Sequence, residues 1–259
     1  LLADAYYWSD NDIVVHTRSM YGGSPRLNGP GGGASFLLDQ GGKTTHFAYF
    51  VNERTVQAVV GGLTQDVPAG FRSIGPLSWA GEDSSGQRAA RRSSNDTRAA
   101  SDKPAVFVLP GILGSHLKAG ADQGGKRIWL SLRLIGGLSR LKYLPDGADG
   151  VKPDGPIGMI YDDLMDHLAE THEVFPFSFD WRRPIEEEAC RLADAVDAAL
   201  DARNGSGQPV RIVAHSMGGV LTRTMQLERP KTFDRLMTRA GARVLMLGTP
   251  NGGSWAPMQ

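Results

Sequence analysis

A serine stands between a short apolar run and a helical pattern in residues 209–222. Residues 210–213 predict a buried strand, because three of the four are apolar and β-branched and turn residues bound the run. Ala214 and Gly218 flank Ser216 at the two-residue spacing of a nucleophile elbow, a sharp strand-to-helix turn. Such a turn needs small flanking residues because the strand and helix backbones pass close together. The pattern therefore predicts that Ser216 is a nucleophile rather than a helix cap.

Further apolar runs predict the strands around this one. They lie at residues 105–109, 174–179 and 243–247, with helical patterns between them. Because short buried strands that alternate with helices form a parallel sheet covered on both faces, we predict an α/β fold with a doubly wound, mainly parallel sheet. Ligands of such sheets bind beyond the carboxyl ends of the strands. Those ends are Pro110-Gly111, Asp180, Ser216 and Thr249-Pro250.

The composition excludes several classes of protein. Lys and Arg together number 28, as do Asp and Glu, so no net field attracts nucleic acid. The single cysteine, Cys190, excludes an internal disulfide and a cysteine-based metal cluster, and we predict neither a cofactor nor a metal. No apolar run approaches the length of a membrane span, so we expect a soluble protein and favour the cytoplasm. A transient membrane contact and the oligomeric state stay open.

The chain divides into three parts by composition. We expect an acid- and histidine-bearing part at 1–65, a linker at 66–103 and a second part at 104–259 that contains the elbow. Residues 81–103 are rich in Ser, Arg, Asp and Gly and contain few large apolar side chains, which predicts partial disorder. In the first part, residues 11–15 predict a strand edge, and Asn52 predicts the cap of a helix over 53–60 that Gly61-Gly62 ends.

Several motifs occur in one order in the second part. They are Pro-Gly-Ile-Leu-Gly-Ser-His-Leu from Pro110, Ile-Trp-Leu from Ile128, Phe-Asp-Trp-Arg from Phe179, Ala-His-Ser-Met-Gly-Gly from Ala214 and Gly-Thr-Pro from Gly248. In combination they resemble the lecithin:cholesterol acyltransferase-like branch of the α/β-hydrolases over about residues 104–256. The resemblance implies a hydrolase-type sheet and an ester or lipid substrate.

The same resemblance implies roles for particular residues. In that family the elbow serine attacks a carboxylic ester, which here is the role of Ser216. The oxyanion is held by backbone N–H groups, which here belong to Met217 and Ile112, with Leu113 adjacent as an alternative. Asp180 resembles the acid of the family's Asp-Trp-Arg signature, and we expect it to pair with Arg182 and brace a loop rather than to act in catalysis.

The chain departs from the family in the order of its catalytic residues. An α/β-hydrolase presents serine, acid and histidine in that order, yet no acid strand and histidine follow Ser216. Residues 1–62 resemble the missing end. By that resemblance Asp12 is the acid and His46 the histidine, with Asp10 and His16 as reserves; alternatively, Asp12 and His46 are an ordinary turn carboxylate and loop histidine.

Two arrangements explain this order. Either the chain spans the tail of one hydrolase domain and the front of the next, or the fold is circularly permuted. We favour the tandem fragment because the chain begins at Leu1 and ends at Gln259 without the marks of natural termini. The predicted activity is that of a serine esterase, lipase or acyltransferase. A catalytically silent binding or scaffolding module is the alternative, and a peptidase, which would cleave amides, is a third possibility.

Overall fold

A computed structural model of the chain describes part of its N-terminal region and most of the rest. The described residues are 11–12, 14–21, 34–39, 44–74, 102–119, 126–129, 141–145 and 149–254. The reserve acid Asp10 and residues 75–101 of the predicted linker lie outside them. Among the described helices, none has the length and apolar composition needed to cross a membrane.

The central sheet is parallel, as predicted. Its described strands are arranged in the order β7-β3-β8-β9. Their bounds are Glu173–Pro176 (β7), Ala105–Leu109 (β3), Val210–His215 (β8) and Arg243–Leu247 (β9). Because the strands are parallel, their carboxyl ends meet at one edge of the sheet, where the site lies.

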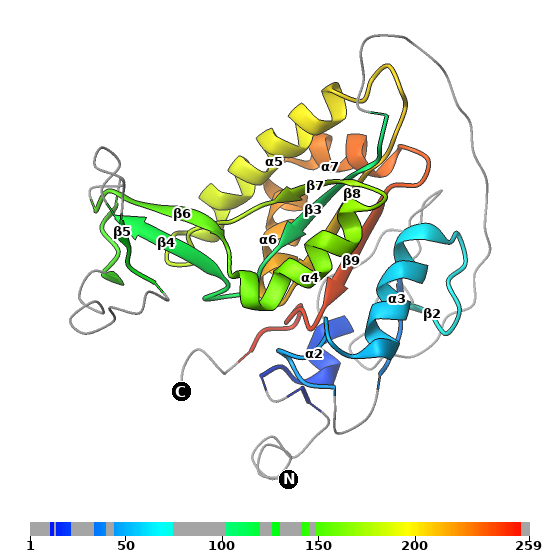
Figure 1. Ribbon diagram of the computed structural model, residues 1–259, viewed down its shortest axis with the longest axis horizontal. Coiled ribbons are helices and arrows are strands. Elements are labelled where there is room, and N and C mark those ends of the chain that lie inside the picture. Colours follow the sequence, from blue (N-terminus) through cyan, green and yellow to red (C-terminus); the bar gives the residue numbers. More distant parts are fainter. Residues whose placement is uncertain are drawn as a thin grey trace.

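Helices cover both faces of this sheet, which confirms the predicted α/β class (Figure 1). One face packs on α5 (Ile185–Asp201), α6 (Met217–Glu228) and α7 (Pro230–Met237). The other packs on α4 (Gly158–Ala169) and α3 (Glu53–Thr64). Alternate residues of a strand point to opposite faces, so β3 contributes Phe107 to the first core and Val108 to the second.

Two smaller antiparallel sheets accompany the central sheet (Figure 1). In the first, β4 (Ser115–Ala119) pairs with β5 (Lys126–Arg127) and β6 (Val151–Pro156). In the second, β1 (Ala34–Phe36) pairs with β2 (Arg72–Ile74). The predicted linker at 66–103 thus begins with an ordered part that includes β2.

Some predicted boundaries are wrong. Helix α3 runs through Gly61-Gly62 to Thr64, because Gly62 lies against Leu245 of β9 and packing supports the last turn. Strand β7 ends at Pro176 rather than at residue 179. Phe177 still donates a hydrogen bond to the carbonyl of Val108, and the chain then turns so that the N–H of Phe179 reaches the Ser115 hydroxyl.

The predicted strand edge at 11–15 is also wrong. Asn11 and His16 form an isolated antiparallel bridge around a tight turn. The Asp12 carboxylate bends this turn by accepting the N–H groups of Val14 and Val15, as short side-chain caps do in competition with strand pairing. The short helix α2 (Thr17–Tyr21) follows, and the carbonyl of Ser19 accepts the N–H of Gly252 beyond β9. The N-terminal segment thereby contacts the carboxyl edge of the central sheet.

Candidate active site

Ser216 occupies a strained turn between β8 and α6. Its backbone angles are φ 53° and ψ −121°, a conformation that non-glycine residues avoid and that nucleophile elbows impose. The N–H of Ser216 donates to the carbonyl of Leu247, 2.8 Å away, which ties the turn to the end of β9. The small residue at Gly218 is required, because an added β-carbon would lie 2.7 Å from the carbonyl oxygens of Leu109 and Pro110.

His46 lies directly against this serine. Its Nε2 atom is 2.8 Å from the Ser216 Oγ, and its Nδ1 atom is 2.6 Å from the Asp12 Oδ2. A carboxylate only accepts hydrogen bonds, so the ring proton sits on Nδ1 and Nε2 is free to accept the serine proton. All three side chains are buried. The structure therefore brings together Asp12, His46 and Ser216 in the relative order that acyl transfer by a serine requires.

The Asp12 carboxylate has a full set of donors. Its Oδ1 accepts the N–H groups of Val14 at 3.1 Å and Val15 at 2.7 Å, and its Oδ2 accepts the hydroxyl of Tyr49 at 2.6 Å as well as His46. Burial by itself would raise the pKa of Asp12. The hydrogen bonds and the charge of His46 outweigh burial, so the pKa lies below its ordinary value and the group stays ionised.

Backbone contacts also join His46 to Asp12. The N–H of His46 donates to the carbonyl of Asp12 at 2.9 Å. The turn that contains His46 leads into α3, whose N-terminus is capped by the side chain of Asn52, as predicted. Beyond β9, Gly248 has a φ of 56°, and an added β-carbon there would lie 3.0 Å from the Asp12 Oδ2 and 2.7 Å from the Tyr49 ring. The glycine of the Gly-Thr-Pro motif therefore leaves room for Asp12.

The loop after β3 lies beside Ser216. An added β-carbon at Gly111 would be 3.0 Å from the Cβ of Ser216. Leu113 in this loop has a φ of 61°, and Leu113 and Ser216 are the non-glycine residues with positive φ in the part of the chain that the structure describes. The Trp129 indole donates to the Leu113 carbonyl at 2.7 Å and so fixes this loop.

The two residues expected to form the oxyanion hole adjoin residues at the site: Met217 follows Ser216 in the chain, and Ile112 follows Gly111. Ile112 belongs to the loop after β3, and Met217 is the first residue of α6. N–H groups in the first turn of a helix have no acceptor within the helix, and the helix dipole places positive potential there. The Met217 amide is thus suited to stabilise a developing negative charge.

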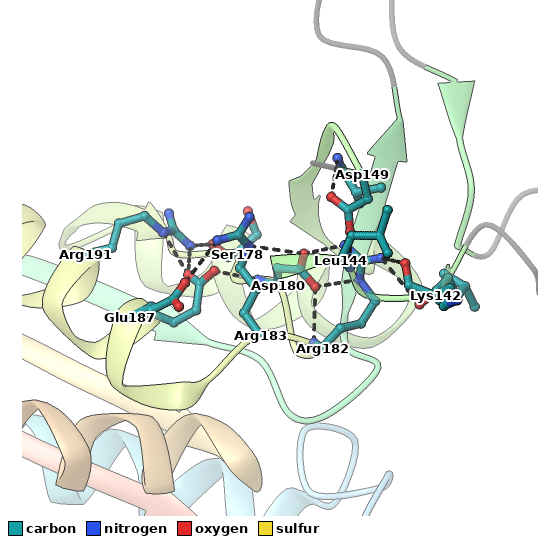
Figure 2. A network of polar contacts seen from close by, with 12 residues as sticks. Lys142, Leu144, Asp149, Ser178, Asp180, Arg182, Arg183, Glu187 and Arg191 are labelled. Carbon is teal, nitrogen blue, oxygen red and sulfur yellow. Dashed lines mark hydrogen bonds and ion pairs between the residues drawn. The ribbon is translucent and has the colours of Figure 1, made fainter. Parts of the chain in front are cut away.

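The reserve histidine and the Asp-Trp-Arg acid lie in other surroundings. His16 belongs to the bridge with Asn11. Asp180 is fully buried and makes a two-pronged contact with Arg182, Nε to Oδ1 at 2.9 Å and Nη2 to Oδ2 at 2.7 Å. Arg182 also contacts Asp149 at 3.0 Å and the carbonyls of residues 141 and 142 (Figure 2). The Asp180–Arg182 pair thus ties the loop after β7 to residues 141, 142 and 149.

Three buried rings around Asp12, His46 and Ser216 were not predicted from the sequence. The Tyr49 hydroxyl donates to Asp12. His215 contacts the main-chain oxygen of His46, and Tyr161 contacts His215 and the backbone N–H of Gly111 in the loop after β3. The available signal for His215 and Tyr49 was their position in the sequence, one residue before Ser216 and three after His46. Tyr161 sits in the middle of α4, and its sequence context gave no such signal.

Comparison with known proteins agrees with the motifs. A sequence model of the family described as lecithin:cholesterol acyltransferase matches residues 121–259, more than half of the 259 residues. The matched range contains Ser216, while Asp12 and His46 precede it. A search of curated proteins returned no match. With a parallel sheet covered by helices on both faces, the chain belongs to the lecithin:cholesterol acyltransferase family of α/β-hydrolases.

Proposed function

We propose that this chain is a serine acyl hydrolase or acyltransferase that acts on carboxylic esters of lipids through an acyl-enzyme. The observation that supports this most directly is the pair of contacts made by His46, 2.8 Å to Ser216 and 2.6 Å to Asp12. Membership of the family favours a lipid ester as the substrate.

Acylation follows from the direction of proton transfer among the three side chains. The Ser216 oxygen attacks the ester carbonyl while its proton passes to the Nε2 of His46, and Asp12 stabilises the imidazolium that forms. The negative oxygen of the tetrahedral intermediate is held by the N–H groups of Met217 and Ile112, each worth about 3 to 4 kcal/mol of transition-state stabilisation. The intermediate collapses when the alcohol oxygen leaves with the proton from Nε2, and an acyl-Ser216 ester remains.

Deacylation reverses these roles. Water or a second alcohol attacks the acyl-Ser216 ester, and the Nε2 of His46 takes the proton of the attacking oxygen. The Ser216 oxygen then leaves and regains a proton from His46. Water as the acceptor gives hydrolysis, and an alcohol gives acyl transfer.

We further propose that the fold is circularly permuted, with residues 1–62 supplying the acid and base of the same hydrolase unit as Ser216. This replaces the expected tandem fragment, in which Asp12 and His46 would belong to a different domain. The contacts of His46 and the hydrogen bond between Ser19 and Gly252 support the proposal.

The experiment that tests the function is covalent labelling with a fluorophosphonate, followed by assays with p-nitrophenyl esters of short and long acyl chains. We expect phosphonylation at Ser216, none in Ser216→Ala, and unchanged labelling in Ser206→Ala, whose hydroxyl lies in an exposed turn. Turnover of the esters with added alcohol distinguishes hydrolysis from transfer. An unlabelled Ser216 in a folded chain would refute the proposal and favour the catalytically silent binding module. Cleavage of anilides instead of esters would favour a peptidase.

Mixing two inactive variants tests the permutation. Ser216→Ala and His46→Ala each lack one member of the triad. If the triad forms within one chain, the mixture stays inactive at every concentration. If the base of one chain serves the serine of another, activity returns in the mixture and rises with concentration.

A further inference from the structure

A second histidine, His215, lies immediately before the nucleophile and is 3% exposed. Its Nε2 atom is 2.8 Å from the main-chain oxygen of His46, and its Nδ1 atom is 2.8 Å from the Tyr161 hydroxyl. The same hydroxyl is 2.9 Å from the backbone nitrogen of Gly111. One row of hydrogen bonds thus joins four segments: the loop that contains His46 (the base loop), the end of β8, α4 and the loop after β3.

The two ends of this row fix the direction of every hydrogen bond. A backbone N–H can only donate, so Gly111 donates to the Tyr161 oxygen, and Tyr161 must direct its own proton to the Nδ1 of His215. A carbonyl can only accept, so the Nε2 of His215 carries the ring proton and donates to the oxygen of His46. Neutral His215, protonated on Nε2, satisfies all the partners.

We propose that His215 is a positioning residue. Together with Tyr161 it holds the base loop and the loop after β3 in fixed positions around Ser216. This rests on the proposed function. At one end the row fixes the main chain of His46, whose N–H is already held by the carbonyl of Asp12. At the other end it fixes the peptide of Gly111, next to the Ile112 amide. Misplacement of either loop by about 1 Å is enough to slow an enzyme by about 100-fold.

The environment of His215 suits this task. Its ring centroid lies 4.8 Å from that of His46, which becomes positively charged when it takes the serine proton. A protonated His215 would oppose that charge and would leave the Tyr161 proton without its acceptor. Burial, helped by the nearby charge of His46, lowers the pKa of His215 to about 3, so the ring stays neutral throughout the cycle.

Replacing Tyr161 with phenylalanine tests the link without removing a ring from the core. Active sites are first titrated with the fluorophosphonate, so that misfolded molecules do not count. We expect kcat per titrated site to fall by about tenfold or more with KM within about twofold, because the lost hydrogen bonds position groups that act in the transition state. A trifluoromethyl ketone, which adds reversibly to the serine and mimics the oxyanion, should bind more weakly by the factor lost in kcat/KM. Tyr143→Phe, whose ring lies over Arg183, serves as the matched control.

His215→Gln tests the other half of the row. The glutamine amide retains a donor toward the carbonyl of His46 but loses the acceptor geometry for Tyr161. We expect kcat per titrated site to fall about as far as in Tyr161→Phe, and the double variant to lose little more, because both changes break one row. His172→Gln is the control, since His172 is another buried histidine at the opposite end of the sheet.

The outcomes separate the two proposals. If the wild-type chain is neither labelled nor active, the proposed function fails. If the wild type is active and Tyr161→Phe retains its kcat per titrated site and its affinity for the ketone, the positioning role is refuted while the proposed function stands. A smaller titrated fraction with unchanged kcat per site would likewise refute it, since that result means a contribution to folding alone.

Discussion

The Nε2 atom of His46 lies 2.8 Å from the Oγ atom of Ser216, although 170 positions separate the two residues in the chain. The contact joins a loop before α3 to the turn after β8, and both are buried. No other described histidine makes this contact with Ser216: His215 precedes the serine but directs its ring to Tyr161 and to the main chain of His46. The choice of base is therefore a specific prediction.

We expect His46→Ala to lower phosphonate labelling and ester turnover by at least about 10⁴-fold, because the serine proton then has no acceptor. The rate of labelling measured by mass spectrometry checks this. His16→Ala is the control and tests the reserve histidine of the sequence analysis. A strong loss in His16→Ala with little loss in His46→Ala would reverse the assignment.

Asp12→Asn should be about as damaging in catalysis, with kcat lower by about 10⁴-fold. The reason lies in the hydrogen-bond donors around Asp12. Val14, Val15, His46 and Tyr49 all direct hydrogens at its two oxygens, and an asparagine has one oxygen to offer them. The histidine would then turn to the wrong tautomer. Stopped-flow assays on titrated enzyme measure this, with Asp39→Asn as the control carboxylate, and a variant that keeps a tenth of the wild-type kcat would contradict the role of Asp12.

The elbow could be predicted from the sequence because its determinants are local. An apolar strand, small residues around Ser216 and a helix pattern all lie within a short stretch, and their conformation depends on close backbone approach. The parallel sheet could also be predicted, because the alternation of strands and helices is visible in local sequence patterns. The candidate acid and base could be selected only by resemblance, since nothing local to Asp12 or His46 distinguishes them from a turn carboxylate and a loop histidine.

What the sequence could not decide depends on contacts between distant segments. Whether residues 1–62 dock on the unit that contains Ser216 is set by packing of α3 on β9 and by the hydrogen bonds around Asp12, none of which has a sequence period. The same is true of Tyr161, whose hydroxyl matters only because α4 places it between Gly111 and His215. Helix α3 extends beyond the end predicted at Gly61-Gly62, because the packing of Gly62 near Leu245 offsets the low helix propensity of the two glycines.

Alanine substitutions at two separate glycines, Gly218 and Gly61, test the packing of the elbow. Gly218→Ala places a β-carbon 2.7 Å from the carbonyl oxygens of Leu109 and Pro110, which are backbone atoms that yield only if β3 moves. We expect the free energy of unfolding to fall by about 1 to 3 kcal/mol, with loss of activity. Gly61→Ala in α3, where the nearest atom would be 3.7 Å away, should instead stabilise the protein by about 0.5 to 1 kcal/mol. Urea denaturation of both variants checks the contrast, and equal effects would contradict it.

The Asp180–Arg182 pair is expected to matter for stability. The side chains are 0% and 4% exposed, so Arg182→Met leaves a buried carboxylate without its main partner and should lower the free energy of unfolding by about 3 to 5 kcal/mol. Arg127→Met removes one cation from the partly exposed pair with Asp154 and should cost less than about 1 kcal/mol. If Arg182→Met keeps its stability but loses kcat per titrated site, the pair acts in catalysis rather than in bracing the loop.

The dependence of stability on pH should reveal two of the buried histidines, His172 and His215. Burial and neighbouring positive charge lower the pKa of His172 to about 4 and that of His215 to about 3, whereas an unfolded histidine titrates near 6.5. Between about pH 6.5 and 4 the unfolded chain therefore binds more protons than the folded one, and the free energy of unfolding falls as the pH is lowered. Each histidine contributes a slope of up to about 1.4 kcal/mol per pH unit in this range.

His172→Gln separates this contribution from that of the carboxylates. The glutamine oxygen can still accept from Arg211, which lies 2.6 Å from the His172 Nε2, but it takes up no proton. Urea denaturation at about pH 5 and about pH 6, both within the histidine range and above the usual pKa of Asp and Glu, should show a slope lower by about one proton's worth. An unchanged slope would mean that folded His172 is protonated there, and the Arg211 guanidinium, which can only donate, would then face a charged ring with no lone pair to receive it.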